Sequence, residues 1–221
     1  LAPSAVEILD AETVRVTNEQ QGLSLAIKPT LFVEFHGTEA AVQEQIGYLR
    51  EICEDNGCAS FEDALSPDER EHLWRARKEA RDSIKLSNAG KTMVSGDVCV
   101  PISHFAEMIP FVHDVGRRLG LKIYAFGHAG DGNLHVYVLK DELGEESWES
   151  RREAVMADLY EKAGELRGQV SGEHGIGYDK QGQLCELLGE TALELMRAIK
   201  RSFDPKNILN PGKVVCGEQS R

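Results

Sequence analysis

Two histidines flank a glycine-rich segment, GHAGDGNLH, at residues 127–135. Asp131 and Gly132 at its centre form a favoured two-residue loop for a β-hairpin, because such a loop needs positive φ at its central positions. With this loop, His128 would pair directly with His135, with Cβ atoms about 5 Å apart on one face of the ladder. Two imidazoles in this position can bind one cation at about 2.1 Å from each nitrogen. The alternative is a pair of solvent-exposed hairpin residues.

A third candidate ligand lies in a second glycine-rich segment, SGEHGIG, at residues 171–177. Glu173 would supply a carboxylate oxygen, and two His plus one Glu with an open position is the pattern of catalytic zinc sites. His174 would stay free for proton transfer near neutral pH. The same residues could instead form an ordinary exposed loop after a helix.

A helix expected over residues 67–85 carries a basic edge. Its aromatic and basic residues recur at three- and four-residue steps: Trp74, Arg77, Lys78, Arg81 and Lys85. Planar guanidinium groups suit bidentate binding of a carboxylate. The alternative is a solvated charged face, partly neutralised by Glu79 and Asp82. Four further histidines are interpreted as structural or surface residues: His36, His72, His104 and His113.

The composition excludes some classes of protein. A formal net charge of −12 over 221 residues argues against nucleic acid as the main partner. No apolar run approaches the roughly 20 residues of a membrane-spanning helix. Five cysteines without a CxxC pair favour a reducing compartment over a disulfide framework. The chain starts at Leu1 rather than Met, which predicts a processed terminus or a piece of a longer protein.

The elements that must position these residues alternate along the chain. Strands are expected at residues 29–37, 58–64 and 92–101, and two more within 121–140. Helices are expected from Thr38 to residue 55 and over 67–85, 102–120, 147–166 and 183–202. Pro110 should bend or break the third of these helices near residue 109. A turn-rich tail follows.

This order predicts an α+β fold, a ferredoxin-like sandwich with helices on one face of a largely antiparallel sheet and a C-terminal extension of helix and turns. Residues 1–170 would form an α+β cap or substrate domain, and residues 171–221 a C-terminal segment. A doubly wound parallel sheet is the competing arrangement. It is disfavoured because no GxGxxG follows a first strand and residues 121–140 look like a hairpin.

Three motifs in order, GHAGDGNLH, SGEHGIG and LNPGKV, resemble the C-terminal part of FAD-linked oxidases of the vanillyl-alcohol-oxidase type. D-lactate dehydrogenase, the flavin subunit of glycolate oxidase and D-2-hydroxyglutarate dehydrogenase are of this type. The resemblance runs from about residue 5 to 215. LWRAR and SGDVCVPIS agree with it, and the latter is most similar to the D-lactate and glycolate branch.

The resemblance implies roles for particular residues. A divalent metal, usually zinc in the family, would be held by His128, His135 and Glu173. His174 would be the base that removes the hydroxyl proton, and Arg77 would bind the substrate carboxylate. Asn210, in LNPGK, would belong to the segment that returns to the flavin.

Two positions depart from the 2-hydroxyglutarate branch, which has an asparagine and a threonine where this chain has Tyr137 and Arg81. The resemblance therefore favours a small monocarboxylate such as D-lactate or glycolate, oxidised to a 2-oxo acid with hydride transfer to FAD. The family binds FAD mostly through an N-terminal domain with a glycine-rich loop for the pyrophosphate, and nothing in this sequence supplies that loop. The chain is thus expected to be one half of an enzyme and inactive alone.

The implied partners are a small 2-hydroxy acid, the FAD-binding domain, and an electron-acceptor protein or quinone. Cytoplasm is the expected compartment, and the family likeness also allows peripheral attachment at a membrane. Two other classes stay open. One is a metal-dependent hydrolase, although the sequence has no HExxH. The other is a metal-binding module without catalysis of its own.

Overall fold

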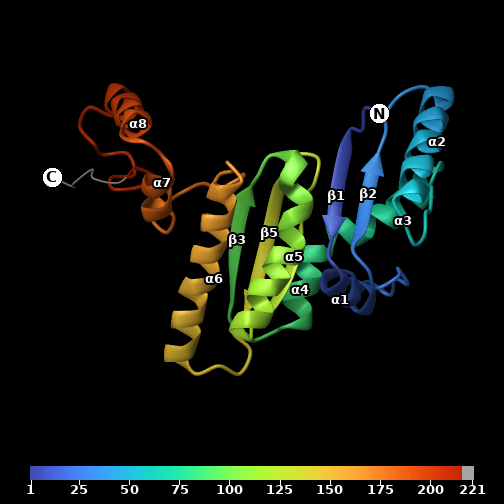
Figure 1. The fold of residues 1–221 in the computed structure, drawn as a ribbon, viewed down its shortest axis with the longest axis horizontal. Coiled ribbons are helices and arrows are strands. Elements are labelled where there is room, and N and C mark those ends of the chain that lie inside the picture. The colour runs from blue at the N-terminus through green and yellow to red at the C-terminus, as the bar shows by residue number, and fades with distance from the viewer. Residues whose placement is uncertain (216–221) are drawn as a thin grey trace.

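The structure, a computed structural model, describes residues 1–215. Its centre is one five-stranded sheet in the order β2-β1-β4-β5-β3, in which all neighbouring strands run antiparallel (Figure 1). The strands are β1 Ala5–Leu9, β2 Thr30–Glu34, β3 Met93–Cys99, β4 Lys122–His128 and β5 Asn133–Leu139. The predicted α+β class and antiparallel sheet are confirmed, and the parallel alternative is excluded.

Helices cover both faces of the sheet rather than one. Within residues 1–215 they are α1 Ala11–Gln21, α2 Glu39–Asp55, α3 Pro67–Lys78, α4 Ala80–Ser87, α5 Ile102–Leu119, α6 Glu145–Glu165, α7 Gln181–Leu187 and α8 Glu190–Phe203. Along β4, Ile123 and Ala125 pack in the core with α5 and α6, whereas Tyr124 and Phe126 pack in the core with α1, α3 and α4. The one-face prediction was wrong because apolar residues occupy both sides of this central strand.

Two predicted helix starts are confirmed, and capping residues account for both. Ser66 and Glu69 form a capping box with Pro67 in the first turn of α3. Thr38 caps α2 by accepting a hydrogen bond from the amide of Ala41. The long basic helix, however, is interrupted at Glu79, so residues 67–85 are divided between α3 and α4.

Other predicted elements differ. Residues 58–64 contain no strand, and residues 183–202 are divided between α7 and α8. α5 continues through Pro110 without a break. Pro110 is exposed, so water can hydrogen-bond the carbonyl group that loses its partner there. β1 and α1 are absent from the sequence prediction, although β1 holds Glu7, which contacts the candidate residues His128 and Arg77.

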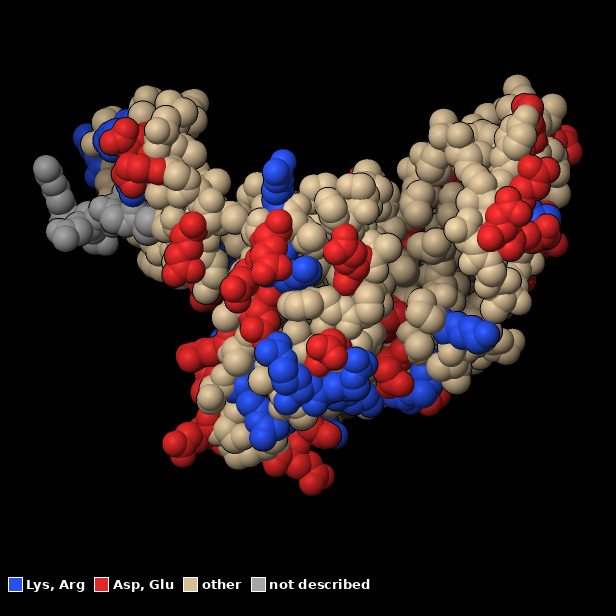
Figure 2. All heavy atoms as spheres, viewed as in Figure 1, with Lys and Arg blue, Asp and Glu red and all other residues tan. Residues whose placement is uncertain are grey.

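Charge is unevenly distributed over the surface. Figure 2 shows Lys and Arg gathered over the lower end of α5, with Asp and Glu spread across much of the rest of this face. Arg117 and Arg118 lie in the last turn of α5, where positive charge offsets the partial negative charge of a helix C-terminus. None of the helices in residues 1–215 is long and apolar enough to cross a membrane.

The cysteines are only partly as expected. Cys53, Cys58 and Cys99 are free thiols, whereas Cys185 is disulfide-bonded, which the cysteine pattern does not predict. Cys216 lies outside the described residues. The segment that starts at residue 171 contains α7 and α8, which lie at one end of the molecule, beyond α6 (Figure 1). The division at residue 170 into a cap domain and a returning segment stays a prediction.

Candidate metal and substrate site

The hairpin of β4 and β5 has a different register from the one predicted. His128 pairs with Asn133 and His135 pairs with Phe126, so the loop spans residues 129–132 instead of two residues. The predicted direct pairing of the histidines was therefore wrong. Because side chains alternate along a strand, both imidazoles still lie on the same face. Their ring centroids are 5.4 Å apart at an interplanar angle of 86°.

The four-residue loop is set by contacts from outside the hairpin. The amide of Gly130 donates to the carbonyl of Val6 in β1 at 2.9 Å, and the amide of Val100 donates to the carbonyl of Gly132 at 2.9 Å. Gly132 has φ +73°, and a Cβ there would collide with the carbonyl oxygen of Val100. The loop is therefore hydrogen-bonded to both neighbouring segments, at Val6 and at Val100. These contacts fix the position of His128 at the end of β4.

The segment carrying Glu173 and His174 is folded around the carboxylate of Asp97, a residue of β3. Oδ2 of Asp97 accepts hydrogen bonds from the Ser171 hydroxyl at 2.7 Å and from the amides of Gly172, Glu173 and His174 at 3.1, 3.1 and 2.8 Å. Burial opposes ionisation of Asp97, but these hydrogen bonds outweigh it and hold its pKa below the usual value. One buried acid thus fixes the backbone of the loop.

This loop brings Glu173 to the two histidines. Oε1 of Glu173 lies 3.1 Å from Nε2 of His135 and 3.8 Å from Nε2 of His128. One ligand atom from each of the three residues lies within 4.8 Å of the others. Tetrahedral zinc with bonds of about 2.1 Å separates its ligand atoms by about 3.4 Å. The three side chains therefore fit a divalent cation in both atom type and spacing.

The buried histidine of the group is suited to ligation. The side chain of His135 is 6% exposed, and burial lowers its pKa to about 4 despite the nearby carboxylates of Glu173 and Asp97. At neutral pH the imidazole is therefore neutral, which is the form that binds a metal ion. Its Nδ1 has no hydrogen-bond partner among the described residues.

His174 lies beside the ligands. Its ring stacks on that of His135 with centroids 5.0 Å apart and an interplanar angle of 10°. Its Nε2 is 3.7 Å from Oε1 of Glu173, and 43% of its side chain is exposed. An accessible imidazole next to the cation position can reach a proton on a bound molecule.

A second grouping shares His135 with the first. Asp97, His135 and His174 also have ligand atoms within 4.8 Å of one another. Oδ2 of Asp97 already accepts four hydrogen bonds. The carboxylate of Glu173 is half exposed and accepts no hydrogen bond from a backbone amide or hydroxyl group within residues 1–215. We therefore assign the candidate cation position to His128, His135 and Glu173.

Arg77 reaches the same face of the sheet from α3. Its guanidinium lies 5.3 Å above the ring of Phe126, which in turn contacts His135. Its Nε donates to Oε2 of Glu7 at 2.7 Å. The Nη groups hydrogen-bond no residue within 1–215, so they can face a substrate carboxylate. Glu7 and Asp97 were missed by the sequence analysis, although each is a lone acid in an apolar strand run.

Asn210 is not joined to this group. It lies in an exposed turn with φ +49°, and its Oδ1 accepts from Lys213 at 3.3 Å. No hydrogen bond or ion pair links it to the histidines in the part of the chain that the structure describes.

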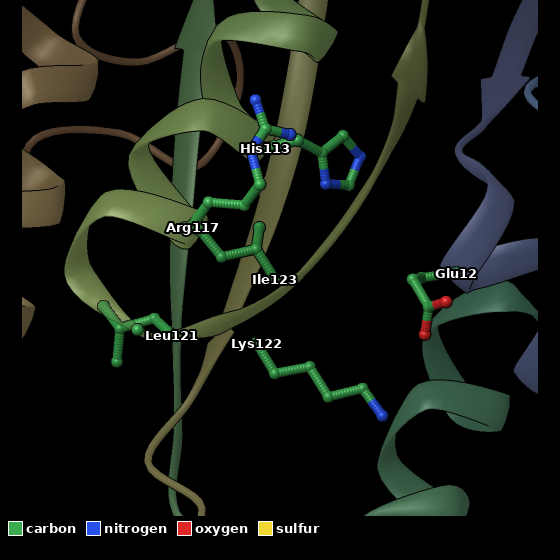
Figure 3. A pocket seen from close by; sticks show the side chains of 8 residues that line it. Glu12, His113, Arg117, Leu121, Lys122 and Ile123 are labelled. Carbon is green, nitrogen blue, oxygen red and sulfur yellow. The ribbon is translucent and has the colours of Figure 1, made fainter.

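A pocket of about 320 Å³ opens elsewhere, lined by α5, β4 and Glu12 of α1 (Figure 3). Figure 3 shows His113 and Arg117 of α5 on one side and Glu12 on the other, with the side chain of Lys122 extending toward Glu12. None of the candidate metal ligands lines this pocket. Of the three candidate ligands, His128 and Glu173 are partly exposed, at 30 and 51%, and His135 is buried.

Comparison with known proteins agrees with the fold and the motifs. The family model for the C-terminal domain of FAD linked oxidases matches residues 1–214. The chain belongs to this family, which confirms the resemblance. A probable mitochondrial D-lactate dehydrogenase of Danio rerio is 36% identical over 95% of this chain and 42% of its own length. Glycolate oxidase subunit GlcD of Bacillus subtilis is 34% identical over 97% of this chain and 45% of its own length.

Solved structures share the fold at low sequence identity. 4-Ethylphenol oxidase from Gulosibacter chungangensis superposes with a TM-score of 0.63 at 15% identity, covering 95% of this chain and 47% of that one. p-Cresol methylhydroxylase superposes with a TM-score of 0.62 at 16% identity, covering 95% and 46%. The chain thus spans less than half the length of the relatives it matches. Relatives from animals, plants and yeasts are described as mitochondrial, so the cytoplasm stays a prediction for this chain.

Proposed function

We propose that this chain is the substrate-side part of an FAD-dependent oxidoreductase that converts a small D-2-hydroxy acid, of the D-lactate or glycolate type, into a 2-oxo acid. The observation that carries the proposal is the convergence of Nε2 of His135, Nε2 of His128 and Oε1 of Glu173. The names of the relatives support the class of substrate. FAD, when bound, supplies the hydride acceptor.

In our proposal, residues of this chain bind the metal ion, bind the substrate and accept the hydroxyl proton. His128, His135 and Glu173 would hold a divalent cation, zinc in our proposal, which lowers the pKa of a coordinated hydroxyl group. The free Nη edge of Arg77 would bind the substrate carboxylate and so orient the carbinol carbon. His174 would accept the hydroxyl proton, since its ring is exposed beside the cation position.

Side chains near Arg77 favour a small substrate. The ring of Tyr137 stacks on Phe126 with centroids 5.7 Å apart, and the residue is 8% exposed. Arg77 lies over the same Phe126 ring, so in our proposal the bulky side chain of Tyr137 leaves less room beside Arg77 for a longer dicarboxylate. Lactate and glycolate place no second carboxylate there.

The FAD-binding domain is the partner that this proposal requires. α8 exposes apolar side chains along one side, Leu195, Ile199 and Phe203, which are 60, 59 and 83% exposed. Exposed apolar patches of this kind mark contact surfaces. We propose that α8 and the turn holding Asn210 pack against that domain and close the open metal site. The electron acceptor would be a protein or a quinone.

The test uses the intact protein, including any FAD-binding domain of its gene. Wild type, His135→Ala and His72→Ala are compared for bound metal by mass spectrometry and for oxidation of D-lactate and glycolate. His72 is an exposed residue of α3 and belongs to neither group of candidate ligands, so its variant should retain metal and activity. His135→Ala should lose both. Metal-dependent hydrolysis without oxidation of any 2-hydroxy acid would defeat the proposal.

A further inference from the structure

One buried carboxylate joins the candidate metal site to the candidate substrate site. Glu7 lies in β1 with 11% of its side chain exposed. Its Oε1 is 2.7 Å from Nδ1 of His128, and its Oε2 accepts from Nε of Arg77 at 2.7 Å. Both oxygens therefore have one charged or polar partner each, from β4 and from α3.

The contact with Glu7 decides which nitrogen of His128 carries a proton. An ionised carboxylate only accepts hydrogen bonds, so Nδ1 of His128 must be the protonated nitrogen. Nε2, which lies 3.8 Å from Oε1 of Glu173, then presents its lone pair to the cation position. This is the way in which a carboxylate behind a ligating histidine fixes its tautomer and ring orientation.

The contact with Arg77 decides which edge of the guanidinium is available. Because Nε is occupied by Glu7, the Nη1 and Nη2 edge is left for an anion. The ion pair is nearly buried, with side-chain exposures of 14% for Arg77 and 11% for Glu7. A pair in this environment is held in one geometry, because separating it leaves an unpaired buried charge.

We propose that Glu7 is a positioning residue that fixes the metal ligand His128 and the carboxylate-binding Arg77 relative to each other. The inference rests on the proposed function. It adds that the metal and the substrate carboxylate are aligned by one side chain of β1. Loss of this side chain should weaken both metal binding and substrate binding.

Glu7→Gln is the informative substitution because it keeps the size of the side chain. A carboxamide has one accepting oxygen and one donating nitrogen. If the oxygen faces Arg77, the amide nitrogen faces His128 and moves the imidazole proton to Nε2. If the oxygen faces His128, the amide nitrogen opposes the N–H of Arg77. Either orientation loses one of the two functions.

The chain offers a matched control on the neighbouring strand. Glu34 of β2 also bridges an arginine and a histidine, with 2.6 Å to Nη2 of Arg70 and 2.7 Å to Nε2 of His36. His36 is 74% exposed and is not a candidate ligand. Glu34→Gln therefore breaks the same kind of bridge without touching the site.

The experiment compares wild type, Glu7→Gln and Glu34→Gln as intact protein. Zinc affinity is measured by competition with a chelator, the tautomer of His128 by its imidazole nitrogen shifts in NMR, and KM and kcat with D-lactate. In Glu7→Gln we expect one of two results. Zinc affinity falls about 10- to 100-fold with a changed His128 tautomer, or KM rises about tenfold or more with the wild-type tautomer. Glu34→Gln should stay within about twofold of wild type on each measure.

Three outcomes would be decisive. Wild-type zinc affinity and KM in Glu7→Gln would overturn the role of Glu7, and so would an Nε2-protonated His128 in metal-free wild type. A wild type that binds no divalent metal would overturn the proposed function itself, while the tautomer measurement still tests Glu7. If Glu7→Gln does not fold, Glu7→Asp keeps the charge but cannot span both partners, and the same losses are expected.

Discussion

The amide of His174 donates a hydrogen bond to Oδ2 of Asp97 at 2.8 Å, although the two residues are 77 positions apart. The same oxygen binds two further amides and the hydroxyl of Ser171. Nζ of Lys180 lies 3.7 Å from that oxygen and donates to the carbonyl of Asp97 at 3.1 Å. The loop that carries Glu173 thus has its shape set by an acid on the edge strand β3.

Asp97→Asn should therefore disturb the loop and the metal site together. Asparagine can still place an oxygen at the Oδ2 position, but that oxygen is neutral and accepts weaker hydrogen bonds than a carboxylate does. We therefore expect a loss of about 1–3 kcal/mol in the free energy of unfolding. Metal affinity should fall about tenfold or more. Denaturant unfolding and chelator competition measure the two effects.

A surface aspartate provides the comparison for Asp97. Asp158 pairs with Arg118 at 2.6 Å on the outside of α6, and such pairs contribute about 1 kcal/mol or less. Asp158→Asn should leave metal affinity unchanged. Equal metal affinity in the Asp97 and Asp158 variants would show that Asp97 does not shape the ligand loop.

Gly172→Ala should keep the loop from closing onto the hairpin. A Cβ at Gly172 would collide with the carboxamide of Asn133. Asn133 is only 5% exposed and cannot easily move aside, so the overpacking should cost about 1–3 kcal/mol. We expect a lower Tm and weaker metal binding, measured by thermal unfolding and metal titration.

Gly182→Ala is the control for that substitution, because nothing lies within 4 Å of a Cβ there and the residue is inside α7. Alanine favours a helix over glycine by about 1 kcal/mol, so Tm should be equal or higher. Unchanged metal binding in Gly172→Ala would contradict the close packing of the loop on Asn133.

Much of the site could be predicted because its chemistry is concentrated in short segments. His128, His135, Glu173 and His174 lie in two glycine-rich motifs, and the structure brings them together. The hairpin register could not be predicted from the motif. Hydrogen bonds to Val6 and Val100 determine it, and these residues lie far away in the sequence.

The residues behind the ligands were missed for a similar reason. Glu7 is 121 positions from His128, and no local pattern links them. The available signal was a single acid within an apolar strand, AVEIL for Glu7 and MVSGDVC for Asp97. A lone buried acid needs partners, and only the tertiary structure identifies them.

Arg77→Lys should weaken substrate binding more than it weakens folding. Lysine cannot offer the planar pair of Nη donors to a carboxylate, and loss of a charged hydrogen bond costs about 1.5–3 kcal/mol. We therefore expect KM for D-lactate to rise about tenfold or more. Arg75→Lys, at an exposed position of the same helix, should have wild-type KM. Equal KM values for both variants would contradict the role of Arg77.

His113 should make stability depend on pH at the junction of α1, α5 and β4. Its Nε2 lies 3.0 Å from Oδ2 of the buried Asp10, and this hydrogen bond raises the pKa of His113 although burial and Arg117 oppose the shift. The stabilisation by this hydrogen bond is thus complete at pH values below the pKa that His113 has in the unfolded chain, about 6.5. It is lost as the pH rises through the higher pKa that His113 has in the folded chain. Glutamine at position 113 stays neutral. The free energy of unfolding of His113→Gln should therefore be about 1 kcal/mol below that of wild type at pH 6, and the difference should be smaller at pH 9.

His104→Gln, on the exposed side of the same helix, is the control and should show little change in urea unfolding at either pH. A deficit for His113→Gln that grows with pH would mean that Asp10 does not stabilise the imidazolium.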